Sequence, residues 1–102
     1  MQIASEATGS RAVLSLNGRF DFHSHRDFRG AYEQILDAQG VREIEINFSG
    51  VDYLDSSALG MLLLLREKAE GMGKSVQLSG LQGTVKQVLE IANFGKLFAV
   101  KD

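Results

Sequence analysis

Three stretches of the chain alternate between apolar and polar residues, which is the pattern of a β-strand with one buried face. These stretches are residues 12–17, 43–48 and 75–79. Gly9 and Ser10 form a turn signal before the first stretch. Residues 2–7 are therefore predicted to form the partner strand of a hairpin.

A helical spacing of apolar residues follows the first of these strands. We expect a loop at residues 18–23, an N-cap at Ser24 and a helix that Gly40 ends from the C′ position. The predicted inward side chains of this helix are Phe28, Tyr32, Ile35 and Leu36.

The polar faces of the later strands bear on the architecture of the whole chain. Strands covered by helices on both sides are continuously apolar, whereas these carry Glu43, Glu45, Asn47 and Gln77. The pattern predicts an α/β fold in which helices pack mainly on one face of a mixed sheet. The predicted order is β-β-α-β-α-β-α, with a short extended tail at residues 97–100 that pairs at an edge.

Composition limits the function classes. A chain of 102 residues fits one domain, residues 1–102, and the absence of cysteine excludes disulfides, thiol catalysis and cysteine-ligated metal. The longest apolar run, Met61–Leu65, is far short of the about 20 residues of a membrane span. The first ten residues do not resemble a secretory signal, and a net charge of −2 gives no electrostatic case for nucleic acid. We expect a cytoplasmic protein without membrane insertion.

Acidic residues cluster in the middle of the chain. Residues 1–65 hold five basic and nine acidic side chains, whereas residues 66–102 hold six basic and four acidic ones. The stretch from Glu43 to Leu65 has four acids and no base. Such a run of acids is usually a solvated surface. This one also contains a segment, residues 46–67, whose pattern is more informative.

That segment joins a strand to a helix. The pattern predicts that the strand ends at Phe48, that residues 49–54 form a loop, and that a helix runs to about Glu70 and ends at Gly71. Asp55 or Ser56 can cap the first helical turn by accepting bonds from its backbone N–H groups. Taken alone, Asp55-Ser56-Ser57 is explained as a capping motif.

A projection of this helix at about 100° per residue separates two faces. The predicted core face contains Ala58, Met61, Leu62, Leu65, Ala69 and Met72. The opposite side contains Ser56, Leu59, Gly60, Leu63 and Glu67. Two leucines and a flat glycine beside a serine hydroxyl suggest a small docking patch.

These residues resemble the STAS domain, and specifically the anti-sigma factor antagonist family. The shared motif consists of Phe48-Ser49-Gly50-Val51, Leu54-Asp55-Ser56-Ser57 and Leu59-Gly60. The likeness extends to Gly18-Arg19-Phe20-Asp21, to the strand at 73–78 and to a final helix and tail. Two residues depart from the pattern: Asn47 stands where the family usually has Asp, and Ala58 where it usually has Gly.

The resemblance implies a function by partner switching. Ser56 would be the phosphorylated residue, and the unphosphorylated protein would bind an anti-sigma factor and release the sigma factor. A serine kinase, which can be the anti-sigma factor itself, and a PP2C-type phosphatase would set its state. Partner contacts are expected at Asp21, Asp55, Ser57, Leu59, Gly60 and Leu63, with Asp52 in the same acidic rim. Neither a cofactor nor a metal is implied.

Other functions have weaker support in the sequence. Ser56 lacks a nucleophile elbow, so we do not expect an enzyme. His23 and His25 are two potential ligands without a third histidine, and Gly73-Lys74-Ser75 lacks the first glycine of a phosphate-binding loop. The closer alternative is another STAS role, as a cytoplasmic subunit of a membrane transporter or as the scaffold of a signalling complex.

Overall fold

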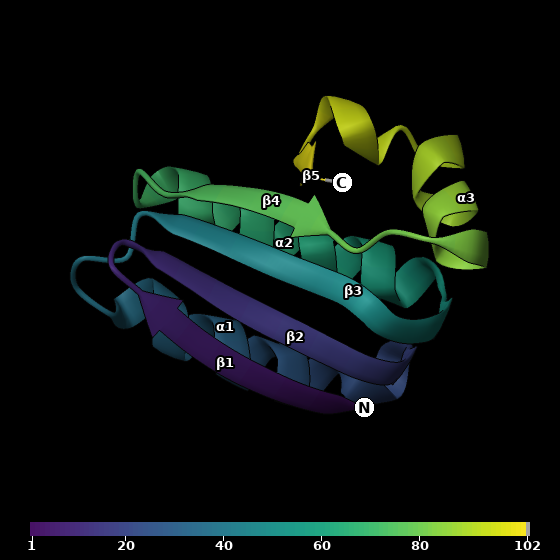
Figure 1. Cartoon of the computed structure of the whole chain (residues 1–102), viewed down its shortest axis with the longest axis horizontal. Coiled ribbons are helices and arrows are strands. Elements are labelled where there is room, and N and C mark those ends of the chain that lie inside the picture. Colours follow the sequence, from purple (N-terminus) through teal and green to yellow (C-terminus); the bar gives the residue numbers. More distant parts are fainter. Residues whose placement is uncertain (102) are drawn as a thin grey trace.

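The computed structural model describes residues 1–101 and places five strands in one sheet whose spatial order follows the chain (Figure 1). The first pair, β1 and β2, is antiparallel, and the remaining neighbours are parallel. The strands are β1 (Gln2–Thr8), β2 (Arg11–Phe20), β3 (Glu43–Leu54), β4 (Ser75–Ser79) and β5 (Ala99–Lys101). The hairpin, the mixed sheet and the edge strand near the C-terminus confirm the predicted fold class.

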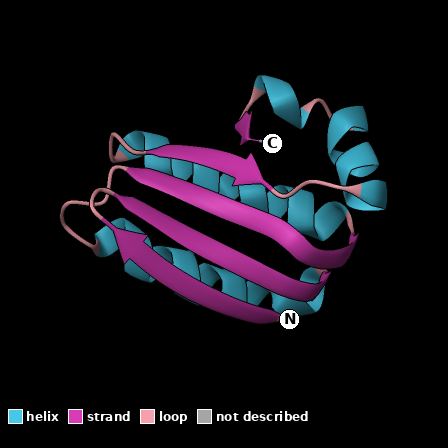
Figure 2. Ribbon diagram, viewed as in Figure 1, coloured by secondary structure: helices cyan, strands magenta, loops and turns pink. Residues whose placement is uncertain are grey.

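Three α-helices and two short 3₁₀ helices complete the described chain. The α-helices are α1 (His25–Asp37), α2 (Ser56–Gly71) and α3 (Gly83–Ile91), and the 3₁₀ helices are η1 (Phe22–Ser24) and η2 (Phe94–Lys96). Figure 2 shows α1 and α2 together behind the sheet, with α3 beyond the arrowhead of β4. One face of β1–β4 therefore stays uncovered, as the polar faces of the strands predicted.

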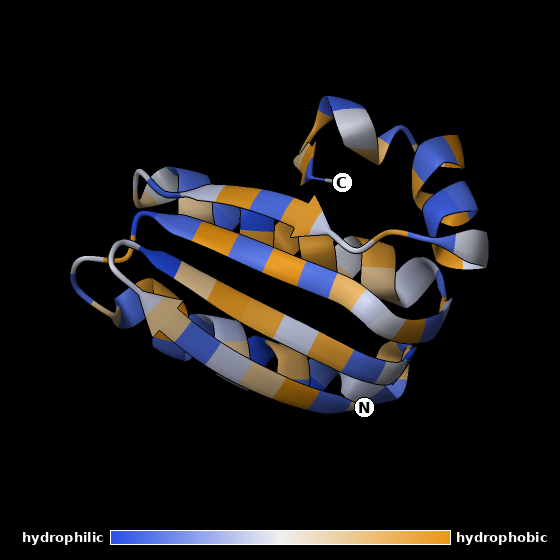
Figure 3. Cartoon of the chain, viewed as in Figure 1, coloured by the Kyte–Doolittle hydropathy of each residue, from blue (hydrophilic) through white to orange (hydrophobic). Residues whose placement is uncertain are grey.

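The core lies between the sheet and the α1–α2 pair. Buried residues recur at alternate positions of β2 and along β3, and Figure 3 shows the apolar residues of the strands as orange bands. The ring of Phe20 is 4.9 Å from that of Phe28 and 6.3 Å from that of Phe48, so β2, α1 and β3 meet in one aromatic cluster. The predicted inward residues of α1 are all buried: Phe28, Tyr32, Ile35 and Leu36.

Glu45 lies on the uncovered face of the sheet and is not the solvated acid that the sequence suggested, because only 8% of it is exposed. Its carboxylate accepts a 2.8 Å hydrogen bond from the Ser79 hydroxyl and lies 3.2 Å from the Arg11 guanidinium. The Ser79 bond, with further help from Lys101, Gln77 and Arg11, holds the pKa of Glu45 below its ordinary value despite its burial. This cluster joins the polar sides of four strands.

The prediction of loops at residues 18–23 and 49–54 was wrong for the residues that continue β2 and β3. Residues 18–20 extend β2, and residues 49–54 extend β3, because the two strands keep pairing as far as Phe20 and Leu54. The pairing shifts between Ser15 and Asn17 and again after Gly18. Each shift interrupts the alternation of apolar and polar residues. The sequence pattern therefore predicted strand ends at residues 17 and 48, before the true ends of β2 and β3. A side chain at position 50 would collide with Asn17, so Gly50 permits the close approach.

The ends of α1 also differ from the prediction. Ser24 occupies the N-cap position, but its hydroxyl donates to the Arg19 carbonyl (3.0 Å) and accepts from the Asp21 N–H (3.3 Å) instead of capping the helix. The helix ends at Asp37 with Ala38 as the C-cap, so Gly40 lies in the turn that follows the C′ position. The φ of +91° at that glycine explains why glycine stands there.

Candidate functional site

The connection between β3 and α2 consists of Asp55 alone. Its carboxylate accepts a 3.1 Å hydrogen bond from the Ala58 N–H, which is the capping interaction that the sequence predicted. Its own N–H donates to the Phe20 carbonyl at 3.3 Å. The start of α2 is therefore fixed to the end of β2, and Ser56 occupies a defined position at the first turn.

Both serines after the cap are exposed. Gly60 has no heavy atom within 4 Å of the place where a Cβ would lie, and Leu63 is 40% exposed. Leu59 is half-buried and packs partly on the core, so it contributes less open surface than the projection suggested. The surface near the two hydroxyls thus consists of a flat glycine and an exposed leucine.

The core face of α2 is close to the predicted one. Ala58, Met61, Leu62, Leu65 and Ala69 are buried. Met72 is the exception: it is 50% exposed because it lies beyond the last helical residue, Gly71. Leu64, which the projection did not select, is 47% exposed.

Two of the three carboxylates expected in the acidic rim accept local hydrogen bonds from the backbone. Asp21 accepts a hydrogen bond from the His23 N–H at 3.0 Å and lies 3.7 Å from Nε of Arg19. The same guanidinium lies 4.0 Å above the ring of Tyr53. Of the three carboxylates expected in the acidic rim, Asp21 caps the N-terminus of η1 and Asp55 caps that of α2. The third, Asp52, is exposed. Arg19 is a basic neighbour of the site that sequence patterning did not select.

The two departures from the family motif fit their surroundings. The Asn47 side-chain oxygen accepts a 2.8 Å bond from the Ser49 N–H, which an amide provides as well as a carboxylate does. Gln82 donates to the carbonyl of the same serine at 3.1 Å, so this part of β3 is held from two sides. Ala58 is fully buried, and its methyl group fills the core under the first turn of α2.

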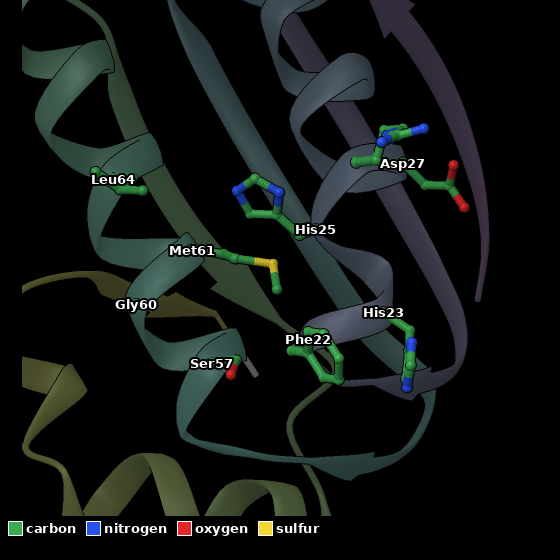
Figure 4. A pocket seen from close by; sticks show the side chains of 9 residues that line it. Phe22, His23, His25, Asp27, Ser57, Gly60, Met61 and Leu64 are labelled. Carbon is green, nitrogen blue, oxygen red and sulfur yellow. The ribbon is translucent and has the colours of Figure 1, made fainter.

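A groove of about 890 Å³ lies between α2 and the η1–α1 segment. Figure 4 shows Met61 and His25 pointing toward each other across it, with Ser57 and Phe22 at one end. The Phe22 ring is 62% exposed and lies 4.2 Å from the ring of His23. Within residues 1–101, no group of three potential metal ligands gathers around these histidines. The sequence pattern gave no signal for this groove, because its walls come from distant parts of the chain.

Comparison with known proteins gives the family. A family model described as "Mlab, STAS domain" matches residues 3–99, so the chain belongs to the STAS domain family. A STAS-domain containing protein of Pseudomonas aeruginosa is 43% identical over 94 residues, which cover 92% of this chain and 91% of that protein.

Solved structures share the fold. The unphosphorylated anti-sigma factor antagonist SpoIIAA of Bacillus aligns with a TM-score of 0.76 and 24% identity over 99% of this chain and 88% of that one. A sulfate transporter family protein of Wolinella succinogenes aligns with a TM-score of 0.77 and 18% identity over 89% of this chain and 75% of that one. No helix within the described residues is long and apolar enough to span a bilayer.

Proposed function

We propose that this protein is an anti-sigma factor antagonist. In its unphosphorylated form it binds an anti-sigma factor and thereby releases a sigma factor, and phosphorylation of Ser56 ends the binding. A serine kinase and a PP2C-type phosphatase set the state of this residue, and the kinase can be the anti-sigma factor itself. The observation that carries the proposal is the exposed hydroxyl of Ser56, held at the first turn of α2 by the Asp55 cap. The similarity to SpoIIAA supports it.

The position of Ser56 favours a change of surface charge over a change of fold. The N-terminus of a helix stabilises an anion by about 0.3–1 kcal/mol, so a phosphate there is compatible with α2. The phosphate adds a charge of about −1.5 to −2 to the exposed surface at the start of α2. Burying that charge without a partner in an interface costs several kcal/mol, and each 1.4 kcal/mol is a tenfold loss of affinity.

The proposal is tested with substitutions at the phosphorylation site. Ser56→Ala should bind the anti-sigma factor irrespective of kinase, whereas Ser56→Asp should bind at least tenfold more weakly with an unchanged melting temperature. Thr84→Asp is a matched control, since this exposed residue lies in the first turn of another helix. Intact mass spectrometry of the protein from its native cells should show the mass of one added phosphate, and peptide mapping should then locate it on Ser56. A Ser56→Asp variant that binds like the unmodified protein would refute the switch.

We also propose that Ser56 accepts phosphate without acting as a nucleophile in hydrolysis. The histidines His23 and His25 lie on η1 and α1, across the groove from α2, and Figure 4 shows the His23 ring directed away from that groove. An active-site serine reagent should therefore leave the protein unlabelled. Covalent labelling at Ser56 would show that the protein is an enzyme.

A second candidate function is that of a cytoplasmic STAS subunit of a membrane transporter, or of a scaffold in a signalling complex. The structural likeness to a sulfate transporter family protein favours the transporter role. Affinity purification with Ser56→Ala as bait discriminates between them. Recovery of an anti-sigma factor supports antagonism, whereas recovery of a transporter ATPase supports the second role.

A further inference from the structure

β1 is an edge strand, and its outer side has no strand partner within residues 1–101. The Ser10 carbonyl accepts a 2.7 Å hydrogen bond from the Arg42 N–H, on the β3 side of β2. Backbone groups alternate in direction along a strand, so those of Arg11 face β1, where Thr8 is the partner. The same alternation along β1 directs the N–H and C=O groups of three residues outward: Ile3, Ser5 and Ala7.

The β1 edge lacks the features that usually keep a strand edge from pairing. It has seven residues, contains neither lysine nor proline, and pairs with β2 without a register shift. The opposite edge of the sheet is protected, because β5 has only three residues and ends at Lys101. A regular unpaired strand such as β1 is a template for the addition of another strand.

A second copy of β1 fits this edge in antiparallel register. With Ser5 opposite its own counterpart, each outward residue enters a pair that exchanges two hydrogen bonds. The half-buried Ile3 then lies opposite Ala7 of the second copy, so a large apolar side chain meets a small one. The one charged residue of β1, Glu6, lies opposite Ala4, so like charges do not face each other directly.

The helix layer favours a second copy over an unrelated strand. Figure 1 shows α1 behind β1 and β2, and α2 behind β3 and β4. Because strands lie about 4.8 Å apart and each helix covers two of them, pairing of the β1 strands places the two α1 helices about 10 Å apart. This is close to the distance at which helices pack in proteins. A strand from another protein would extend the sheet but would leave the outer flank of α1 without a neighbour.

The outer flank of α1 is suited to this contact. The inner flank faces α2, since the Glu33 carboxylate lies 3.6 Å from Nζ of Lys68. The outer flank carries four residues at the spacing i, i+4, i+7 and i+11: Asp27, Ala31, Gln34 and Ala38. Its two alanines pack partly on the core and leave room for a second helix. Figure 4 shows the Asp27 side chain directed away from α2, as this assignment requires.

We propose that the β1 edges of two copies of this chain pair to form a reversible homodimer with one continuous sheet. Seven residues give a contact about 23 Å long, and a sheet and a helix layer together are about 20 Å thick. The dimer therefore buries roughly 900 Å² in total, less than the about 1,200 Å² of stable interfaces, so it exchanges with the monomer. It goes beyond the proposed function and leaves Ser56 free, since α2 lies on the far side of α1 from this edge.

Sedimentation equilibrium between about 10 µM and about 1 mM protein should show a monomer–dimer equilibrium, as expected for a small interface. Ser5→Pro removes the outward N–H at the centre of the contact, and edge strands tolerate proline at such positions. This variant should dimerise at least tenfold more weakly. Ser5→Ala keeps the N–H and is the matched control, which should dimerise within twofold of the unmodified protein.

A second pair of variants tests the edge without altering its backbone groups. Ala7→Lys places a charge in the contact, as protected strand edges do, and should weaken dimerisation at least tenfold. Ser75→Lys makes a similar change at an exposed residue of β4, away from the β1 edge, and should dimerise within twofold of the unmodified protein. Thermal unfolding by circular dichroism shows that each variant is folded.

Hydrogen exchange of the unmodified protein locates the contact at single residues. The amide protons of Ile3, Ser5 and Ala7 should exchange at least threefold more slowly at millimolar protein than at tenfold dilution. Those of Ala4 and Glu6 face β2 and should change much less. This measurement decides the question even if a variant fails to fold.

Three results would overturn the proposal. They are a monomer throughout the concentration range, a dimer that folded Ser5→Pro and Ala7→Lys proteins form as well as the unmodified protein does, and concentration-dependent protection at α2 or β5 in place of β1. The proposed function would survive each of them, since it depends on Ser56 and the anti-sigma factor.

Discussion

Replacing Gly80 with alanine tests how closely the end of β4 approaches β3. The backbone at Gly80 has a φ of +68°, and a Cβ added there would lie 2.7 Å from Oδ1 of Asn47 and 2.8 Å from the N–H nitrogen of Ser49. These are the two atoms that form the 2.8 Å hydrogen bond within β3. Alanine at position 80 therefore strains the backbone at that position, and its Cβ disrupts the hydrogen bond between the Ser49 N–H and the Asn47 side chain.

The expected loss of stability follows from these two effects. A non-glycine residue in the left-handed region costs about 1–2 kcal/mol, and losing a hydrogen bond costs about 0.5–1.5 kcal/mol. Alanine also restricts the unfolded chain, which returns about 0.4–1 kcal/mol. The net loss is about 2 kcal/mol, equivalent to a fall of about 8–16 °C in melting temperature for a domain of this size.

Urea unfolding followed by circular dichroism measures this difference. Gly60→Ala is the matched control, since its Cβ enters open space within α2 and should stabilise the protein by up to about 1 kcal/mol. The double variant Asn47→Ala Gly80→Ala should cost less than the sum of the single changes, because the same hydrogen bond is lost only once. A Gly80→Ala protein as stable as the parent would refute the reasoning.

The remaining predictions concern α2 and the polar cluster on the sheet. Leu63→Glu should weaken partner binding while changing the unfolding free energy by less than about 0.5 kcal/mol, whereas Leu62→Ala, at a fully buried position, should cost about 2–5 kcal/mol in the same urea assay. Asp55→Ala removes the cap of α2 and should cost about 0.5–2 kcal/mol, measured by thermal unfolding. Because the pKa of Glu45 is lowered in the folded protein, its ionised form stabilises the fold above about pH 4.5, and this stabilisation is lost as the pH falls through the folded value. Glu45→Gln should therefore flatten the acid side of the stability profile, and an unchanged profile would show that the carboxylate does not contribute.

The local patterns of the sequence were sufficient for most of the architecture. Alternation at residues 12–17, 43–48 and 75–79 gave the strands and their buried faces, and the uncovered polar face predicted helices on one side. The Asp55 cap and the exposed position of Ser56 also followed from the sequence, because a helix start depends on a few neighbouring residues. The roles proposed for Ser56 and its neighbours stay predictions until binding is measured.

Features that depend on contacts between distant residues required the tertiary structure. The extensions of β2 and β3 escaped the pattern because shifted pairing between them breaks the period of two. Glu45 looked like a surface acid until Arg11 and Ser79 were placed beside it, more than 30 residues away in the chain. The groove arises in the same way, because Phe22 and Leu64 lie on different elements that become neighbours only when α1 and α2 pack on one sheet. The local sequence predicts which apolar residues each element buries, whereas packing determines which polar and exposed residues become neighbours.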